Sequence, residues 1–209
     1  MAEFPVQPVS PEEFLEDFVP RSLRRFQLPA EARRRTLKLG LRLDGKGGGE
    51  WRFDIEHGHL RVRPGSRVDA SITVVQRVQD WRGAMWDGRG GVVGRGVISV
   101  LEHGPDSKPG RRGRSRRILE VLDQLAGLNA VVRVVVTGGL GGDWWVGFKL
   151  GPGRISPKPD VTLSLSAEDA EALLKGDLDL VWAVMGGKLG LSGDKTLMLR
   201  LQSIAKQLG

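Results

Sequence analysis

The chain of 209 residues contains no cysteine and no tyrosine, and its three histidines are His57, His59 and His103. The absence of cysteine excludes disulfide frameworks, zinc–thiolate sites, iron–sulfur clusters and cysteine nucleophiles. The shortage of histidine leaves little for histidine-based metal centres or histidine-dependent catalytic triads. We therefore expect no metal, no cofactor and no catalytic residues, and we expect a protein that is not an enzyme.

Long apolar runs are also missing. No window reaches the roughly 18 apolar residues that a membrane-spanning helix needs. The first residues, MAEFPVQPVSPEEF, lack a basic stretch followed by an apolar one, which a secretory signal would carry. We expect a soluble, cytoplasmic protein.

Glycine is abundant, with 30 residues, but its runs do not form phosphate-binding loops. The runs at 45–49 and 138–142 lie between two predicted strands, whereas a dinucleotide fingerprint leads from a strand into a helix. The stretch GGKL at 186–189 lacks the hydroxyl residue that follows a P-loop lysine. Hairpin turns explain the two inter-strand runs, and a turn explains His57-Gly58-His59 better than a metal site does.

Positive charge is concentrated in one segment. The net charge is +7, and residues 103–117 hold six basic side chains and one acidic one. This stretch, HGPDSKPGRRGRSRR, has no apolar periodicity and is typical of an exposed linker. It could instead bind phosphates of nucleic acid or of an anionic lipid surface.

The segments on either side of this linker share one pattern, which predicts an internal repeat. DGKGGGEWRF at 44–53 matches TGGLGGDWWV at 137–146, which places Trp51 opposite Trp144. VDASITV at 68–74 matches PDVTLSL at 159–165. We predict three parts: a unit at 1–102, the basic linker at 103–117, and a second unit at 118–209.

Each unit alternates apolar and polar residues over short runs, which is typical of a half-buried antiparallel sheet. Helices must cover the apolar face of such a sheet. Two helix starts are marked by capping sequences, Ser10-Pro11-Glu12-Glu13 and Ser166-Ala167-Glu168-Asp169. The fold class predicted is α+β, with helices mainly on one side of the sheet. Trp144 and Trp145 are consecutive, so one should face the helices and the other should face outward.

The stretch from Pro159 to Leu201 resembles the sterol-carrier-protein type-two domain, also called the nonspecific lipid-transfer domain. The similarity lies in an ordered series: a D-x-T-L-x-L-S strand, a helix closing at Lys175-Gly176, a helix from Leu180 to Met185, then G-K-L-x-L-x-G-D and a last helix. With the preceding GGDW hairpin, the match covers about 115–209. The first unit resembles the same domain more weakly, as a degenerate copy without the second and last helices.

This resemblance implies two sterol-carrier-like units, each a mostly antiparallel sheet of about five strands covered by helices. It also implies an apolar tunnel for a fatty acyl chain, a phospholipid or a sterol. The candidate ligand-binding residues are Phe148, Leu174, Val181, Trp182, Met185, Leu197 and Leu201. Each of these side chains could equally be plain core.

Three functions remain open at this point. The first is non-enzymatic binding or transfer of an apolar ligand, with transient contact of the basic linker with an anionic membrane. The second is a structural or protein-interaction module, in which Trp182 and Met185 fill the cavity. The third is binding of nucleic acid through the Arg-rich linker, which we consider unlikely because the second unit is slightly acidic.

Overall fold

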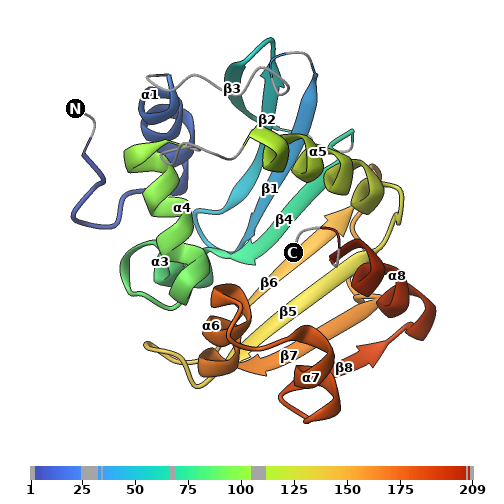
Figure 1. The fold of residues 1–209 in the computed structure, drawn as a ribbon. Helices are drawn as coiled ribbons and strands as arrows, with labels where there is room; N and C mark the ends of the chain where they lie inside the picture. The colour runs from blue at the N-terminus through green and yellow to red at the C-terminus, as the bar shows by residue number, and fades with distance from the viewer. Residues whose placement is uncertain are drawn as a thin grey trace.

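The computed structural model describes residues 3–24, 33, 35–65, 69–104, 112–205 and 207, and Figure 1 shows how their helices and strands are arranged. The described residues form one mixed β-sheet with helices packed against it. The α+β class predicted from the sequence is therefore confirmed.

The elements of the first half come in the order helices, four strands, helices. Their bounds are η1, a π-helix (Glu13–Phe18), α1 (Val19–Leu23), β1 (Leu37–Asp44), β2 (Gly49–Glu56), β3 (His59–Pro64), β4 (Ile72–Arg77), α3 (Val78–Trp86) and α4 (Gly91–His103).

The second half opens on a helix and ends on one. Its elements are α5 (Arg112–Ala126), β5 (Val131–Thr137), β6 (Trp144–Leu150), β7 (Val161–Ser166), α6 (Ala167–Lys175), α7 (Leu180–Met185), β8 (Leu189–Gly193) and α8 (Lys195–Ala205).

All eight described strands belong to one continuous sheet, in the order β3-β2-β1-β4-β6-β5-β7-β8. The two halves join where β4 pairs with β6 in antiparallel fashion, from Ile72 opposite Leu150 to Val75 opposite Gly147. The expectation of two sheets of about five strands each is therefore corrected: each half contributes four strands to a shared mixed sheet. Inter-strand hydrogen bonds cross the boundary between the halves without a break.

The strand pairing of the first half recurs in the second. β1 pairs antiparallel with β2 and parallel with β4, and β5 pairs antiparallel with β6 and parallel with β7. Among the described strands, β3 has no counterpart in the second half and β8 has none in the first. In the second half, β4 pairs with β6 in the place that β3 takes beside β2 in the first half. In the first half, β6 pairs with β4 in the place that β8 takes beside β7 in the second half. Each half thus supplies the neighbouring strand that the other half lacks.

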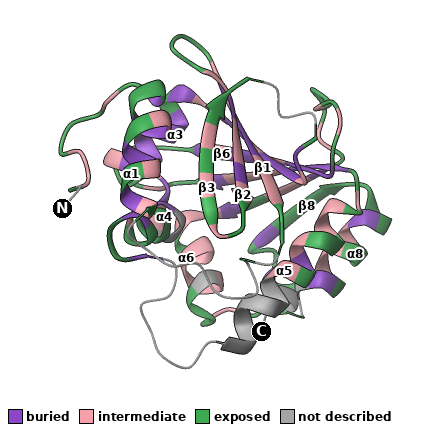
Figure 2. Ribbon diagram, turned by 90° about the horizontal axis from the view of Figure 1, so that it is seen from above, coloured by how far each residue is buried: buried purple, intermediate pink, exposed green. Residues whose placement is uncertain are grey.

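The helices pack on one face of this sheet. Val74 of β4 contacts the core of the first half, which contains Phe14, Trp51 and Trp81, and also the core of the second half, which contains Trp144. Because one side chain touches both cores, both lie on the same side of the sheet. Figure 2 shows the buried residues concentrated between the strands and the helices.

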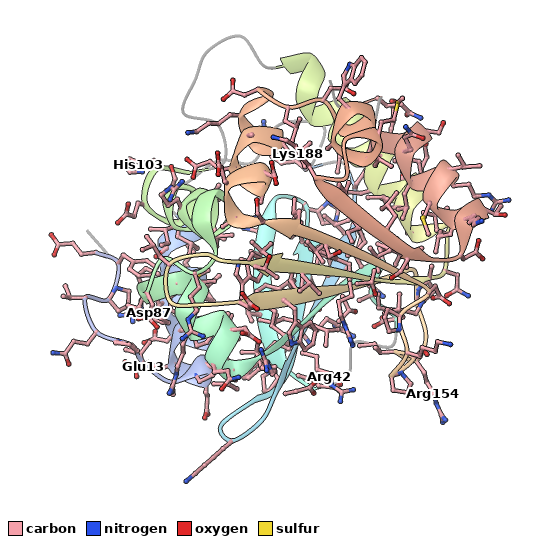
Figure 3. All side chains as sticks on the ribbon, turned by 90° about the horizontal axis from the view of Figure 1, so that it is seen from below. Glu13, Arg42, Asp87, His103, Arg154 and Lys188 are labelled. Atoms are coloured by element: carbon pink, nitrogen blue, oxygen red, sulfur yellow. The ribbon has the colours of Figure 1, made fainter. Side chains whose placement is uncertain are left out.

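The other face of the sheet carries charged side chains. Lys38 Nζ lies 2.8 Å from Asp69 Oδ2, and Arg52 Nε donates to Asp54 Oδ2 over 2.9 Å. The Arg133 guanidinium stacks on Trp145, with its Cζ 4.8 Å from the ring centroid. Trp144 is buried among the helices and Trp145 faces the opposite side, as the alternation predicted. Figure 3 shows Arg42 projecting on this side, away from α6, α7 and α8.

Both predicted capping sequences start helices. The Glu13 backbone N–H donates to Ser10 Oγ over 3.1 Å, and the Asp169 N–H donates to Ser166 Oγ over 3.0 Å. α6 then ends at Lys175, with Gly176 in the left-handed conformation. These hydrogen bonds satisfy N–H groups that a helix start leaves without an intrahelical partner.

The basic segment is partly helical. α5 begins at Arg112, so residues 112–117 of the predicted linker are helical. α4 ends at His103, and residues 105–111 of the predicted linker lie outside the described residues. The division of the chain into a unit, a linker and a second unit stays a prediction.

Two glycines of α4 predict opposite effects of the same substitution. A Cβ on Gly96 would meet nothing within 4 Å, so Gly96→Ala should stabilise the protein by up to about 1 kcal/mol through helix propensity. A Cβ on Gly94 would overlap the backbone oxygen of Ala84 in α3, so Gly94→Ala should destabilise it. Urea unfolding of the two variants measures both effects. Equal shifts in the same direction would contradict the close contact of α3 with α4.

Candidate functional site

A cavity of about 640 Å³ lies in the second half, between the sheet and the helices α5, α7 and α8. We call it the C-terminal cavity. Its wall consists of side chains from these three helices, and its floor consists of side chains from β5, β7 and β8. The lining residues are Val121, Leu125, Val132, Leu163, Val184, Met185, Leu189, Leu191, Lys195, Met198, Leu199, Leu201, Gln202 and Ile204.

The lining is apolar except at two positions on α8, Lys195 and Gln202. Val121 and Val132 are deeply buried, whereas Met185 and Leu199 are 73% and 67% exposed. The cavity therefore runs from an enclosed apolar interior to a rim where apolar side chains meet solvent. Its size falls within the roughly 300–1,000 Å³ that is typical of small-molecule sites.

A short network around Asp160 holds the floor and the wall together. Its carboxylate accepts a hydrogen bond from the Val131 N–H over 2.7 Å, at the start of β5. Its backbone oxygen accepts another from the Asp194 N–H over 2.9 Å, after the end of β8. The Asp194 carboxylate in turn accepts a bond from the Leu197 N–H over 3.0 Å, which caps the start of α8. The position of α8 over the cavity thus depends on the G-D sequence that precedes it.

A second contact fixes the turn between α7 and β8. Lys188, on the helix-covered side of the sheet in Figure 3, places its Nζ 3.2 Å from Asp169 Oδ1 of α6. The hydrogen bond from the Ser166 hydroxyl, followed by that from Lys188, holds the pKa of Asp169 below its usual value. A charged Asp169 keeps both contacts at neutral pH.

The structure brings two of the seven predicted ligand-binding residues to this cavity, Met185 and Leu201. Leu197 is buried beside Ala130 and Val161 and is not a lining residue, and Phe148 lines a different cavity. Trp182 is 68% exposed. The side chains of Leu174 and Val181 lie outside those that the structure describes. A role in ligand binding stays a prediction for all seven.

Sequence reasoning did not select Val121, Leu125 or Ile204 as ligand contacts, although each lines the cavity. An apolar stripe along a helix does not tell a residue beside a cavity from one in a filled core. The signal that separates them is the packing of α5 against α8, which only the three-dimensional arrangement supplies.

Two absences hold for the described residues. They contain no group of three or more histidine, aspartate or glutamate side chains that could hold a metal ion. Among their helices, none combines the length and the apolar composition that crossing a membrane requires.

Residues 115–206 match the model of the SCP-2 sterol transfer family, so the predicted resemblance is confirmed over this range. Among the curated relatives, the chain is 30% identical over 91 residues to hydroxysteroid dehydrogenase-like protein 2 of Bos taurus and 32% identical over 80 residues to that of Rattus norvegicus. These matches cover 41% and 36% of this chain but 22% and 15% of the two relatives. The chain spans about a fifth of the relatives it matches.

Two solved structures are similar to part of the chain. One is the sterol carrier protein domain 2 of Helicoverpa armigera, at 22% identity and a TM-score of 0.36, covering 51% of this chain and 96% of that one. The other is the apo form of sterol carrier protein 2 from Yarrowia lipolytica, at 20% identity and a TM-score of 0.34, covering 60% and 97%.

Proposed function

We propose that this protein binds an apolar ligand, such as a fatty acyl chain, a phospholipid or a sterol, in the C-terminal cavity and carries it without catalysing a reaction. The single observation behind the proposal is the lining, because all but two of the residues around about 640 Å³ of space are apolar. Removing each methylene of such a ligand from water contributes about 0.8 kcal/mol. Met185 and Met198 can adapt to alkyl chains of different shape.

The alternative of an interaction module required a filled cavity. In that case Trp182 and Met185 would occupy the space between sheet and helices, but these two side chains are 68% and 73% exposed. They lie on α7, whose Val184 and Met185 line the rim of the cavity. We propose that the exposed apolar residues of α7 touch the surface from which the ligand enters.

We propose further that the first half is a degenerate copy of the second. The recurring strand pairing and the Trp51 and Trp144 hairpins support a duplication. The C-terminal cavity uses side chains of α7, β8 and α8, and the described part of the first half has no strand equivalent to β8. One cavity of this kind per chain follows from that difference.

The basic segment 103–117 offers a contact for an anionic membrane in a cytoplasmic setting. α5 carries its last residues at one end and the cavity-lining Val121 and Leu125 further along. Docking of the basic end would therefore place the cavity wall near the lipid surface. Nucleic acid remains the less favoured partner of this segment.

Filling the cavity tests the proposal. Met198→Trp places a larger side chain in the apolar interior, and we expect uptake of a fluorescent sterol, which has no carboxylate, to fall at least tenfold, a loss of about 1.4 kcal/mol or more. Lipid extraction followed by mass spectrometry should detect an acyl or sterol ligand with the wild type and less of it with the variant.

The matched control is Ser203→Trp, which adds the same side chain at an exposed position of α8 and should leave uptake unchanged. If Met198→Trp does not fold, Val121→Phe fills the same space from α5. The proposal fails if the wild type neither co-purifies with an apolar ligand nor takes up the probe, or if the folded filled variants bind it as the wild type does.

A further inference from the structure

A second cavity, of about 470 Å³, lies over the central strands, where the two halves meet. We call it the central cavity. Its floor is the apolar face of β5, β6 and β7, and its sides are the loop between α3 and α4, the β5–β6 loop, and α6. The lining residues are Gly88, Arg89, Gly90, Gly91, Arg95, Val134, Val136, Gly138, Gly139, Leu140, Trp144, Val146, Phe148, Leu165, Ala167, Glu168, Ala170, Glu171 and Leu173.

None of these residues lines the C-terminal cavity, so the two sites are separate. The central cavity also needs both halves of the chain. Its floor belongs to the second half, whereas Gly88 to Gly91 and Arg95 belong to the first. A single sterol-carrier-like unit would lack this side of the cavity.

The Arg89 side chain occupies space that two glycines leave free. A Cβ on Gly83 of α3 would overlap the Arg89 side chain, and a Cβ on Gly141 of the β5–β6 loop would lie 2.7 Å from Arg89 Nε. The side chain therefore runs between α3 and this loop, in space that only glycine leaves free. Its Nε is buried and has no hydrogen-bond partner in the described part of the chain. A buried donor without an acceptor is destabilising, so the protein keeps Arg89 at the cavity wall at a cost in stability.

Two arginines, Arg89 and Arg95, and two carboxylates, Glu168 and Glu171, line the central cavity. α4 starts at Gly91 without a side-chain cap and without an acidic residue in its first turn, so the positive end of the helix dipole lies at the cavity wall. The nearby Glu171 is already engaged, with its Oε1 2.7 Å from Lys175 Nζ and 3.4 Å from Arg95. The hydrogen bond from Lys175 holds the pKa of Glu171 below its usual value.

We propose that the central cavity is a second binding site, for an amphiphile with one carboxylate head and an apolar body. The carboxylate pairs with the guanidinium group of Arg89, which lines the cavity, and the body packs on the floor formed by Val134, Val146 and Phe148. A charge-assisted hydrogen bond of this kind discriminates a carboxylate from a neutral head of the same chain length.

Decanoate and decanol are suitable probes, because they share a ten-carbon chain and differ in the charged head. We would titrate both into the full-length Met198→Trp variant by isothermal calorimetry, so that the C-terminal cavity is filled. One decanoate should bind per chain, at least tenfold more tightly than decanol. Adding Arg89→Met should weaken decanoate binding at least tenfold and change decanol binding less than twofold.

The matched control is Arg82→Met, which removes an exposed arginine of α3 that does not line the cavity and should behave as its parent. If Arg89→Met does not fold by circular dichroism, Arg89→Gln keeps a polar side chain and removes the charge. The proposal is overturned if decanoate does not bind, or if it binds equally to the Arg89 and Arg82 variants. Failure of the proposed function would instead appear in the wild type and the filled variants with the sterol probe, which lacks the carboxylate that the central cavity recognises.

Discussion

Replacing Phe14 with alanine should lower the free energy of unfolding by about 3–5 kcal/mol, as expected for a large core side chain that leaves a cavity behind. Phe14 is 2% exposed and lies at the centre of an aromatic cluster. Its ring centroid is 5.1 Å from that of Phe18 and 5.4 Å from those of Trp81 and Trp86. These residues come from η1 and α3, so the loss would loosen the helices that cover the first half of the sheet.

The shape of the unfolding curve is as informative as its midpoint. Because β4 pairs with β6 inside one sheet, we expect Phe14→Ala to unfold in a single transition when circular dichroism and tryptophan fluorescence are followed in urea. Val6→Ala, at a position that is 95% exposed, should stay within about 0.5 kcal/mol of the wild type. Two separate transitions, with the second half unfolding as in the wild type, would contradict the coupling of the halves.

Local sequence signals predicted the parts of this fold that depend on near neighbours. Ser166 and Asp169 marked the start of α6, and the alternation through Trp144 and Trp145 predicted that their side chains face opposite sides of the sheet. The glycine runs predicted turns, and Gly45 and Gly141 indeed have positive φ angles of 111° and 78°. In each case the physical cause lies within a few residues of the chain, in a cap, a pleat or a turn conformation.

The pairing of β4 with β6 could not be predicted in this way. Val74 and Phe148 lie opposite each other at the junction, but an alternating strand carries no mark of its partner. From the sequence, each half was expected to hold a sheet of about five strands, and whether the two halves share one sheet stayed open. In the structure each half covers an edge of the other, and the exposed edges that two separate units would present are avoided.

The candidate site was predicted in outline and not in its residues. The resemblance placed it between the sheet and the helices of the second half, where the C-terminal cavity lies. The sequence did not show which side chains of α7 point inward, because a helix from Leu180 to Met185 is too short to show which face is buried. Trp182 was expected inside and is exposed, since tertiary packing and not local pattern decides its direction.

Gly193→Ala should have the largest effect on the C-terminal cavity without touching its lining. Gly193 has a φ of 113°, and a Cβ there would overlap the backbone oxygen of Asp160. That oxygen accepts the hydrogen bond from Asp194, whose carboxylate caps α8. We expect a loss of at least about 2 kcal/mol of stability from the strained backbone alone, and a fall in sterol uptake because α8 is displaced.

Gly187→Ala is the matched control for this change. Its φ of 70° is also positive, but a Cβ there would meet nothing within 4 Å, so the cost should be limited to about 1–2 kcal/mol and uptake should persist. Urea unfolding and the fluorescent sterol assay, run on both variants, separate backbone strain from loss of the cavity. If Gly193→Ala bound the probe as well as Gly187→Ala does, the Asp160–Asp194 network would not be what holds α8 over the ligand.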